Sequence, residues 1–111
     1  MELITEALNL KSKAIRTIAE NITQEAFVFI TQEDFENEAG VYDELIQVDV
    51  PNRHNEVKTL KIREVTKDRN GALTFLVQED PDEDCMLIQQ DYIDLEALCT
   101  IADVMKANNV D

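Results

Sequence analysis

An Asn-Gly dipeptide between two strand-like runs is the feature that most limits how this chain can fold. Asn70 and Gly71 lie within residues 57–79, which are otherwise rich in β-branched, aromatic and long aliphatic side chains. Both residues tolerate the positive φ that a type I′ turn requires, so the pattern predicts a β-hairpin with a two-residue loop.

This loop predicts a pairing register and two chemically different faces. Thr66 would pair with Phe75, and Glu64 with Val77. A loop over residues 68–71 leaves the same faces, whereas a β-bulge would invert them. The predicted core face carries Leu60, Ile62 and Leu73, and the predicted solvated face carries Lys61, Arg63, Lys67, Thr74 and Gln78 with the apolar pair Val65 and Leu76.

The segments around the hairpin predict helices at both ends of the chain and further strands between them. Apolar residues recur at three- and four-residue spacing over residues 3–21 and again after residue 94, which is typical of amphipathic helices. Asp91 or Asp94 would cap the second helix. Short strands are predicted at residues 26–31, 42–50 and 85–90.

The two remaining acidic segments are predicted to be irregular. Residues 32–40 are expected to form a loop with Phe35 at the edge of the core, and residues 79–84 hold five carboxylates around Pro81. The sequence therefore predicts one α+β domain over residues 1–111. It would be a four- or five-stranded antiparallel sheet with the N- and C-terminal helices packed on one face.

Charge is abundant and unevenly distributed. The formal net charge is −14 at pH 7; residues 20–52 contain nine carboxylates and no base, and residues 70–111 sum to −9. Direct nucleic-acid binding needs clustered Lys and Arg, and anionic membrane surfaces attract bases as well, so neither partner is expected. A basic protein partner is compatible with this charge.

The chain carries no sign of export or of a membrane span. Its first residues, MELITEALNL, lack a basic start and a long apolar run. Cys85 and Cys99 have no second cysteine pair or histidine partner at metal-site spacing, so they are expected to be reduced thiols. A cytoplasmic location follows from this interpretation.

Residues for catalysis or for cofactor binding are scarce. The chain has a single serine, Ser12, within a predicted helix, and a single histidine, His54, in a predicted connection. A serine nucleophile with a histidine base is therefore not expected, and a cysteine–histidine pair would need a buried thiol to approach His54. With two glycines far apart, no phosphate-binding loop can form, so the sequence predicts neither an enzyme nor a cofactor.

One spacing resembles part of a calcium loop. Asp80, Asp82, Asp84 and Asp91 match positions one, three, five and twelve of such a loop, but Cys85 replaces the glycine at position six. Weak cation attraction to a solvated acidic loop is the simpler interpretation, and no metal is predicted.

Two functions remain as hypotheses. The first is a non-enzymatic protein-interaction module that uses an exposed sheet face or an open edge strand, with a protein partner or a second copy of itself. The second is an acidic inhibitor, or DNA mimic, that binds a basic nucleic-acid-binding protein. The sequence leaves any small-molecule ligand open. The candidate interaction surface consists of Asp80, Asp82, Glu83, Asp84, Lys61, Arg63 and Lys67.

Overall fold

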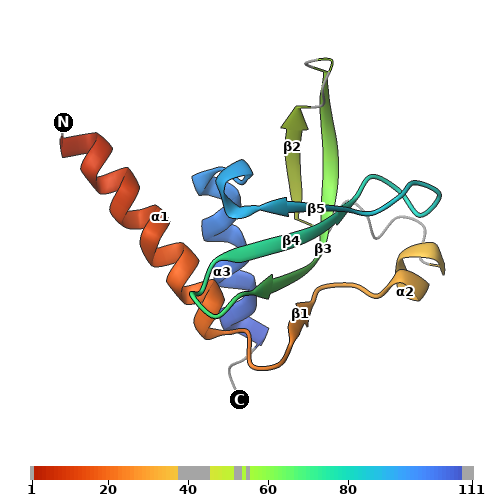
Figure 1. The fold of residues 1–111 in the computed structure, drawn as a ribbon, viewed down its shortest axis with the longest axis horizontal. Coiled ribbons are helices and arrows are strands. Elements are labelled where there is room, and N and C mark those ends of the chain that lie inside the picture. Colours follow the sequence, from red (N-terminus) through yellow and green to blue (C-terminus); the bar gives the residue numbers. More distant parts are fainter. Residues whose placement is uncertain (1, 38–45, 52–53, 55, 109–111) are drawn as a thin grey trace.

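The computed structural model of this chain describes residues 2–37, 46–51, 54 and 56–108. This part of the chain contains three α-helices, five strands and one short 3-10 turn. In order, the elements are α1 (Glu2–Glu20), β1 (Ala26–Val28), α2 (Gln32–Asn37), β2 (Gln47–Pro51), β3 (Val57–Lys67), β4 (Leu73–Gln78), β5 (Met86–Gln89), the 3-10 turn η2 (Gln90–Tyr92) and α3 (Leu95–Asn108) (Figure 1).

The five strands form one antiparallel sheet with the order β1-β3-β4-β5, and β2 also pairs with β3. Lys61 of β3 pairs with Gln47 of β2 and with Gln78 of β4, so β2 and β4 lie on opposite edges of β3. β1 pairs with residues 64–66 and β2 with residues 57–61, end to end along that edge. The long central strand β3 therefore organises the sheet.

The predicted α+β architecture is confirmed. α1 and α3 contact each other and cover one face of the sheet, where their apolar side chains join those of the strands in a single core. Ile18 of α1, Ile101 of α3 and Phe75 of β4 are fully buried in that core. Burial of this shared apolar surface is the main stabilising contribution to such a two-layer domain.

The hairpin lies where the sequence places it, but the predicted two-residue loop and its register are wrong. Lys67 pairs with Leu73 and Asp68 N–H donates to Ala72 O at 3.0 Å, so the loop spans residues 69–71, and Val65 rather than Thr66 pairs with Phe75. The physical reason is Asp68, whose Oδ1 accepts the backbone N–H groups of residues 70 and 72 at 2.8 and 3.0 Å and so stabilises a wider turn.

A β-bulge at Arg63 then shifts the register again. On one side of it Glu64 pairs with Leu76, and on the other Ile62 pairs with Val77. The bulge lets Ile62 and Val65 both lie buried on the helix-covered face although they are three positions apart, an offset that would place them on opposite faces of a regular strand. The prediction that Val65 lies on the solvated face is therefore wrong.

In the acidic segment after β1, residues 32–37 form a helix where a loop was predicted over residues 32–40, and residues 38–40 lie outside the described residues. Thr31 Oγ1 accepts the backbone N–H of Asp34 at 3.1 Å, and Glu33 and Asp34 occupy the first turn of α2, where acidic side chains oppose the helix dipole favourably. Phe35 is fully buried as expected. The predicted strand at residues 42–50 is confirmed from Gln47 onward, and residues 42–45 lie outside the described residues.

The backbone conformation of the wider hairpin loop requires glycine most clearly at Gly71. Its φ is +83°, and a Cβ there would meet nothing within 4 Å, so an alanine would be strained only by the backbone. We expect Gly71→Ala to lower the free energy of unfolding by about 1 kcal/mol, as measured by urea denaturation. Gly71→Asn should lose less, because asparagine tolerates positive φ. Equal losses for the two variants would contradict this explanation.

Candidate functional site

Large apolar side chains are exposed around β5, which is an edge strand paired with β4. Ile88 lies opposite Phe75 on the covered face and is buried, whereas Leu87 points to the opposite face and is 70% exposed. Met86, at the start of the strand, is 47% exposed, and Tyr92, just after the strand, is 61% exposed. Isolated exposed apolar residues are ordinary, but several together usually mark a contact surface.

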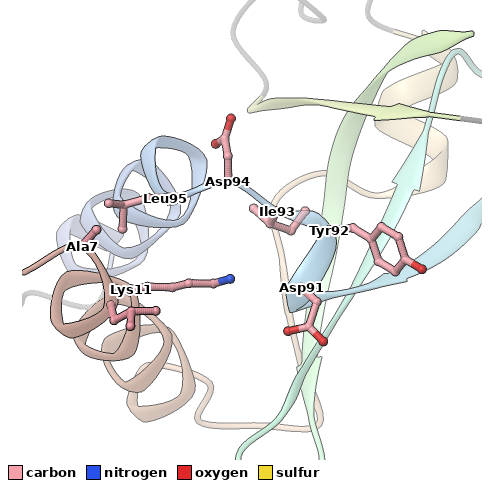
Figure 2. A pocket seen from close by; sticks show the side chains of 8 residues that line it. Ala7, Lys11, Asp91, Tyr92, Ile93, Asp94 and Leu95 are labelled. Atoms are coloured by element: carbon pink, nitrogen blue, oxygen red, sulfur yellow. The ribbon is translucent and has the colours of Figure 1, made fainter. Parts of the chain in front are cut away.

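A groove separates the start of α1 from the segment that enters α3. Residues 6–10 of α1 are all exposed, while Ala14 and Ile18 further along the helix are buried, so α1 leaves the core towards its N-terminus (Figure 1). The groove has a volume of about 480 Å³ and is lined by Ala7, Leu8, Lys11 and residues 91–95. Figure 2 shows Lys11 extending from α1 across this groove.

A second groove, of about 470 Å³, lies along β5 and is lined by Val50, Tyr92 and residues 86–89. Tyr92 lines both grooves, and its ring points away from α1 (Figure 2). The two grooves therefore join the exposed side chains of three elements into one surface. We call this surface the Tyr92 strip and define it as Leu8 (60% exposed), Met86, Leu87 and Tyr92.

Asp94 is held in place on the wall of the first groove. Its Oδ1 accepts the backbone N–H of Ala97 at 2.8 Å, and its carbonyl oxygen accepts the N–H of Leu98 at 3.0 Å. Of the two aspartates predicted as caps, Asp94 is therefore the N-cap of α3. Asp91 belongs to η2 and leaves its carboxylate exposed beside the strip.

A buried arginine organises the opposite end of the sheet. Arg63 is 4% exposed, and its Nη1 donates to Gln32 Oε1 of α2 at 2.7 Å and to Gln78 Oε1 of β4 at 3.1 Å. The same nitrogen lies 3.4 Å from Cys85 Sγ, and the guanidinium carbon lies 5.8 Å from the centre of the Phe35 ring. These five residues, which we call the Arg63 junction, attach α2 and the end of the acidic loop to the face of the sheet that α1 and α3 leave open.

The predicted basic face does not exist as such. Arg63 is buried beneath α2, and Lys67 lies on the helix-covered face, where its Nζ donates to Ala19 O at 2.8 Å and satisfies a carbonyl in the last turn of α1. The wider loop moves Lys67 to that face. Lys61 is partly buried and donates to the carbonyl oxygen of Glu79, so the three bases form no common exposed surface.

The predicted acidic residues are mostly at the surface. Asp82, Glu83 and Asp84 are exposed and Asp80 is partly buried. Asp80 Oδ1 accepts the N–H of Asp82 at 2.9 Å, and the carbonyl oxygen of Glu83 accepts Gln78 Nε2 at 2.7 Å, which fixes the loop to the Arg63 junction. This turn is irregular, as predicted.

The Arg63 junction brings two acidic segments to one end of the sheet. One belongs to α2 and the other to the loop before β5, and both lie at the same side in Figure 1. Within the described residues, Lys58 forms a salt bridge with Glu79 at 3.5 Å. None of the other carboxylates of these two segments forms one with a described residue. We call the group the acidic end: Glu33, Asp34, Glu36, Asp80, Asp82, Glu83 and Asp84.

The described residues offer few side chains for metal binding or for thiol chemistry. Among the residues that the structure describes, no three carboxylate, histidine or cysteine side chains are grouped as a metal ion would require, and the aspartates of the calcium-like spacing are no exception. Cys85 and Cys99 are both free; Cys85 is exposed and Cys99 is partly buried. No helix in the described part of the chain is long and apolar enough to cross a membrane.

The Tyr92 strip was missed in the sequence because its members look like ordinary strand and helix residues. The run MLIQ predicts a strand but does not say that the strand lies at an edge. The available signal was the position of this run between the acidic residues 79–84 and Asp91, because natural edge strands are often bordered by charge.

No protein-family model, no curated protein and no solved structure matches this chain.

Proposed function

We propose that this chain is a non-enzymatic protein-interaction module that binds its partner through the Tyr92 strip. The observation that carries the proposal is the joining of four exposed apolar side chains by two grooves that share Tyr92. Tyrosine is enriched among the residues that contribute most of the binding energy in protein interfaces, and aromatic residues and methionine are enriched in interfaces generally. The rim carries Lys11, Asp91 and Asp94, which suits the polar border of such an interface.

The cellular location belongs to the same proposal. Both cysteines are free, and free thiols are typical of reducing compartments. We therefore propose that the module acts in the cytoplasm.

The test compares two variants of the strip with one equally exposed apolar control. Leu87→Asp and Tyr92→Ser change the strip, whereas Val57→Asp changes a residue of β3 that is 64% exposed and lies outside it. Partners captured by the wild-type chain should be purified and titrated directly. We expect each strip variant to raise the dissociation constant at least about tenfold, which is a loss of about 1.4 kcal/mol of binding free energy. The control variant should leave the dissociation constant unchanged.

Two further measurements make this comparison decisive. Urea unfolding should show Leu87→Asp within about 0.5 kcal/mol of the wild type, because the side chain is exposed. Analytical ultracentrifugation should establish whether the partner is a second copy. A partner that binds the wild type, both strip variants and the control equally would refute the Tyr92 strip as the interface.

The alternative function is an acidic inhibitor or DNA mimic that binds a basic nucleic-acid-binding protein. Its support is the acidic end, where the Arg63 junction holds seven carboxylates from two segments together. Such binding should compete with DNA and weaken steeply with salt. Replacing residues 82–84 by Asn, Gln and Asn should abolish it while Leu87→Asp leaves it intact, which separates the two functions.

A further inference from the structure

The open edge of β5 has backbone groups directed away from the sheet. Asp68 N–H donates to Ala72 O at 3.0 Å and so extends the β3–β4 ladder. Because the bonding direction alternates along an antiparallel strand, Phe75 and Val77 turn their backbone groups towards β5, where they pair with Ile88 and Met86.

The residues of β5 that alternate with these partners therefore face outward. Leu87 and Gln89 direct their backbone N–H and C=O groups to the side on which no described strand pairs with β5. The side-chain amide of Gln90, which follows the strand, accepts Leu73 N–H at 2.9 Å and so agrees with this alternation. Such an edge is a template for one more strand.

Side chains on both sides of this edge belong to the Tyr92 strip. Leu87 projects from the open face of the sheet and Met86 from the covered face, and both line the groove along β5 together with Tyr92. Alternate side chains of an added strand would point to these two sides in turn. An apolar residue of that strand can therefore contact Leu87 on the open face or Met86 on the covered face.

Charge defines the two ends of the edge. Residues 82–84 lie before β5, separated from it by Cys85, and carry three exposed carboxylates, and Asp91 and Asp94 follow the strand with two more. The sequence contains no Lys or Arg between residues 70 and 105, and Lys11, which lines the first groove with Asp91 and Asp94, is one base against these five carboxylates. An added segment with Lys or Arg at both ends would complement this pattern.

A second copy fits this edge poorly. Antiparallel pairing of β5 with β5 of another copy would bring residues 82–84 of each chain next to Asp91 and Asp94 of the other. Like charges across neighbouring strands are destabilising, and two chains of net charge −14 repel each other as a whole. The acidic border thus opposes self-pairing while it favours a basic segment.

We infer that the partner of the proposed interaction module presents an extended segment, apolar in its centre and basic at both ends, which adds to the open edge of β5 as a further strand. The inference rests on the proposed function and names the chemistry of the partner. The added strand bonds with the backbone of Leu87 and Gln89, and its terminal bases lie beside residues 82–84 and Asp91.

The test uses synthetic peptides as probes. The peptide KRTVTVTRK, with blocked termini, has the predicted pattern, and EETVTVTEE reverses its end charges. A third peptide has the first sequence with backbone N-methyl groups on alternate central residues, which removes the donors that would face β5. We expect the first peptide to shift the amide resonances of Leu87 and Gln89, and the other two to bind at least about tenfold more weakly.

A matched pair of variants addresses the edge itself. Gln89 has φ −89° and ψ 162°, about 25° from the φ that proline prefers, so a proline needs a small backbone adjustment, removes the outward N–H and leaves the preceding residue extended. We expect Gln89→Pro to weaken the first peptide about tenfold, while Gln89→Ala leaves it unchanged. Circular dichroism and urea unfolding of both variants should match those of the wild type.

The outcomes separate this inference from the proposed function. If the N-methylated peptide binds as well as its parent, or if no peptide perturbs Leu87 and Gln89, strand addition is refuted even where the natural partner still requires Leu87 and Tyr92. If a dimer forms that Gln89→Pro disrupts, a second copy occupies the edge and the inference is wrong. Failure of the strip variants to affect the natural partner would instead refute the proposed function.

Discussion

Replacing Phe75 by alanine is expected to lower the free energy of unfolding by about 3–5 kcal/mol. Phe75 is fully buried in β4, pairs with Val65 of β3 and Ile88 of β5, and lies in the core beneath α1 and α3. Truncating the ring removes buried apolar surface and leaves a cavity. The three strands and two helices around it can relax only partially, so the cavity stays open. A domain of this size has a total stability of about 5–15 kcal/mol, so the loss is large.

Urea denaturation followed by circular dichroism measures this effect. Val57→Ala is the matched control, because Val57 lies in the same sheet but is 64% exposed; its loss should stay within about 0.5 kcal/mol. If Phe75→Ala lost no more than this control, the core would not be organised around β4 as described.

The second large effect is expected at the Arg63 junction. Arg63→Ala should lower stability by about 2–4 kcal/mol, because it opens a cavity and leaves Gln32 Oε1 and Gln78 Oε1 without this donor. Arg63→Met should lose less, since methionine fills much of the volume and brings no charge that must be desolvated. The arginine has a buried Nε without a hydrogen-bond partner, so the native arrangement is itself incompletely satisfied.

Hydrogen exchange distinguishes a local from a global effect at this site. Arg63 attaches α2 and the acidic loop to the sheet through Gln32 and Cys85. In Arg63→Ala the amides of α2 should therefore lose protection more than those of β4. Uniform loss of protection along the chain would mean that the junction belongs to the main core. Release of α2 should also divide the acidic end, which weakens the alternative function but leaves the Tyr92 strip intact.

The hairpin illustrates how far local sequence rules reach. Asn70-Gly71 correctly located the turn, because positive φ is a property of a residue and its immediate neighbours. The length of the loop depended on the Asp68 side chain, and the register depended on a bulge at Arg63. Two such shifts of one residue decide which side chains face the core.

The three bases of β3 also show that local patterns do not predict contacts with distant residues. Lys61, Arg63 and Lys67 were predicted on one solvated face from strand alternation alone. Arg63 is instead buried by contacts with residues 32, 78 and 85, and Lys67 reaches the end of α1 at residue 19. No periodicity within β3 contains information on these distant partners.

Local sequence alone was enough to specify the terminal amphipathic helices, the strands between them and the segregation of acidic residues, although not α2, because propensity, turn chemistry and charge act over a few neighbouring residues. Strand order and packing decided that β5 is an edge, that Leu87 and Tyr92 are exposed and that α2 meets the acidic loop. Exposure and convergence are properties of the whole chain, since each depends on which distant segments cover or approach a residue. The candidate interface therefore became visible only in the tertiary structure.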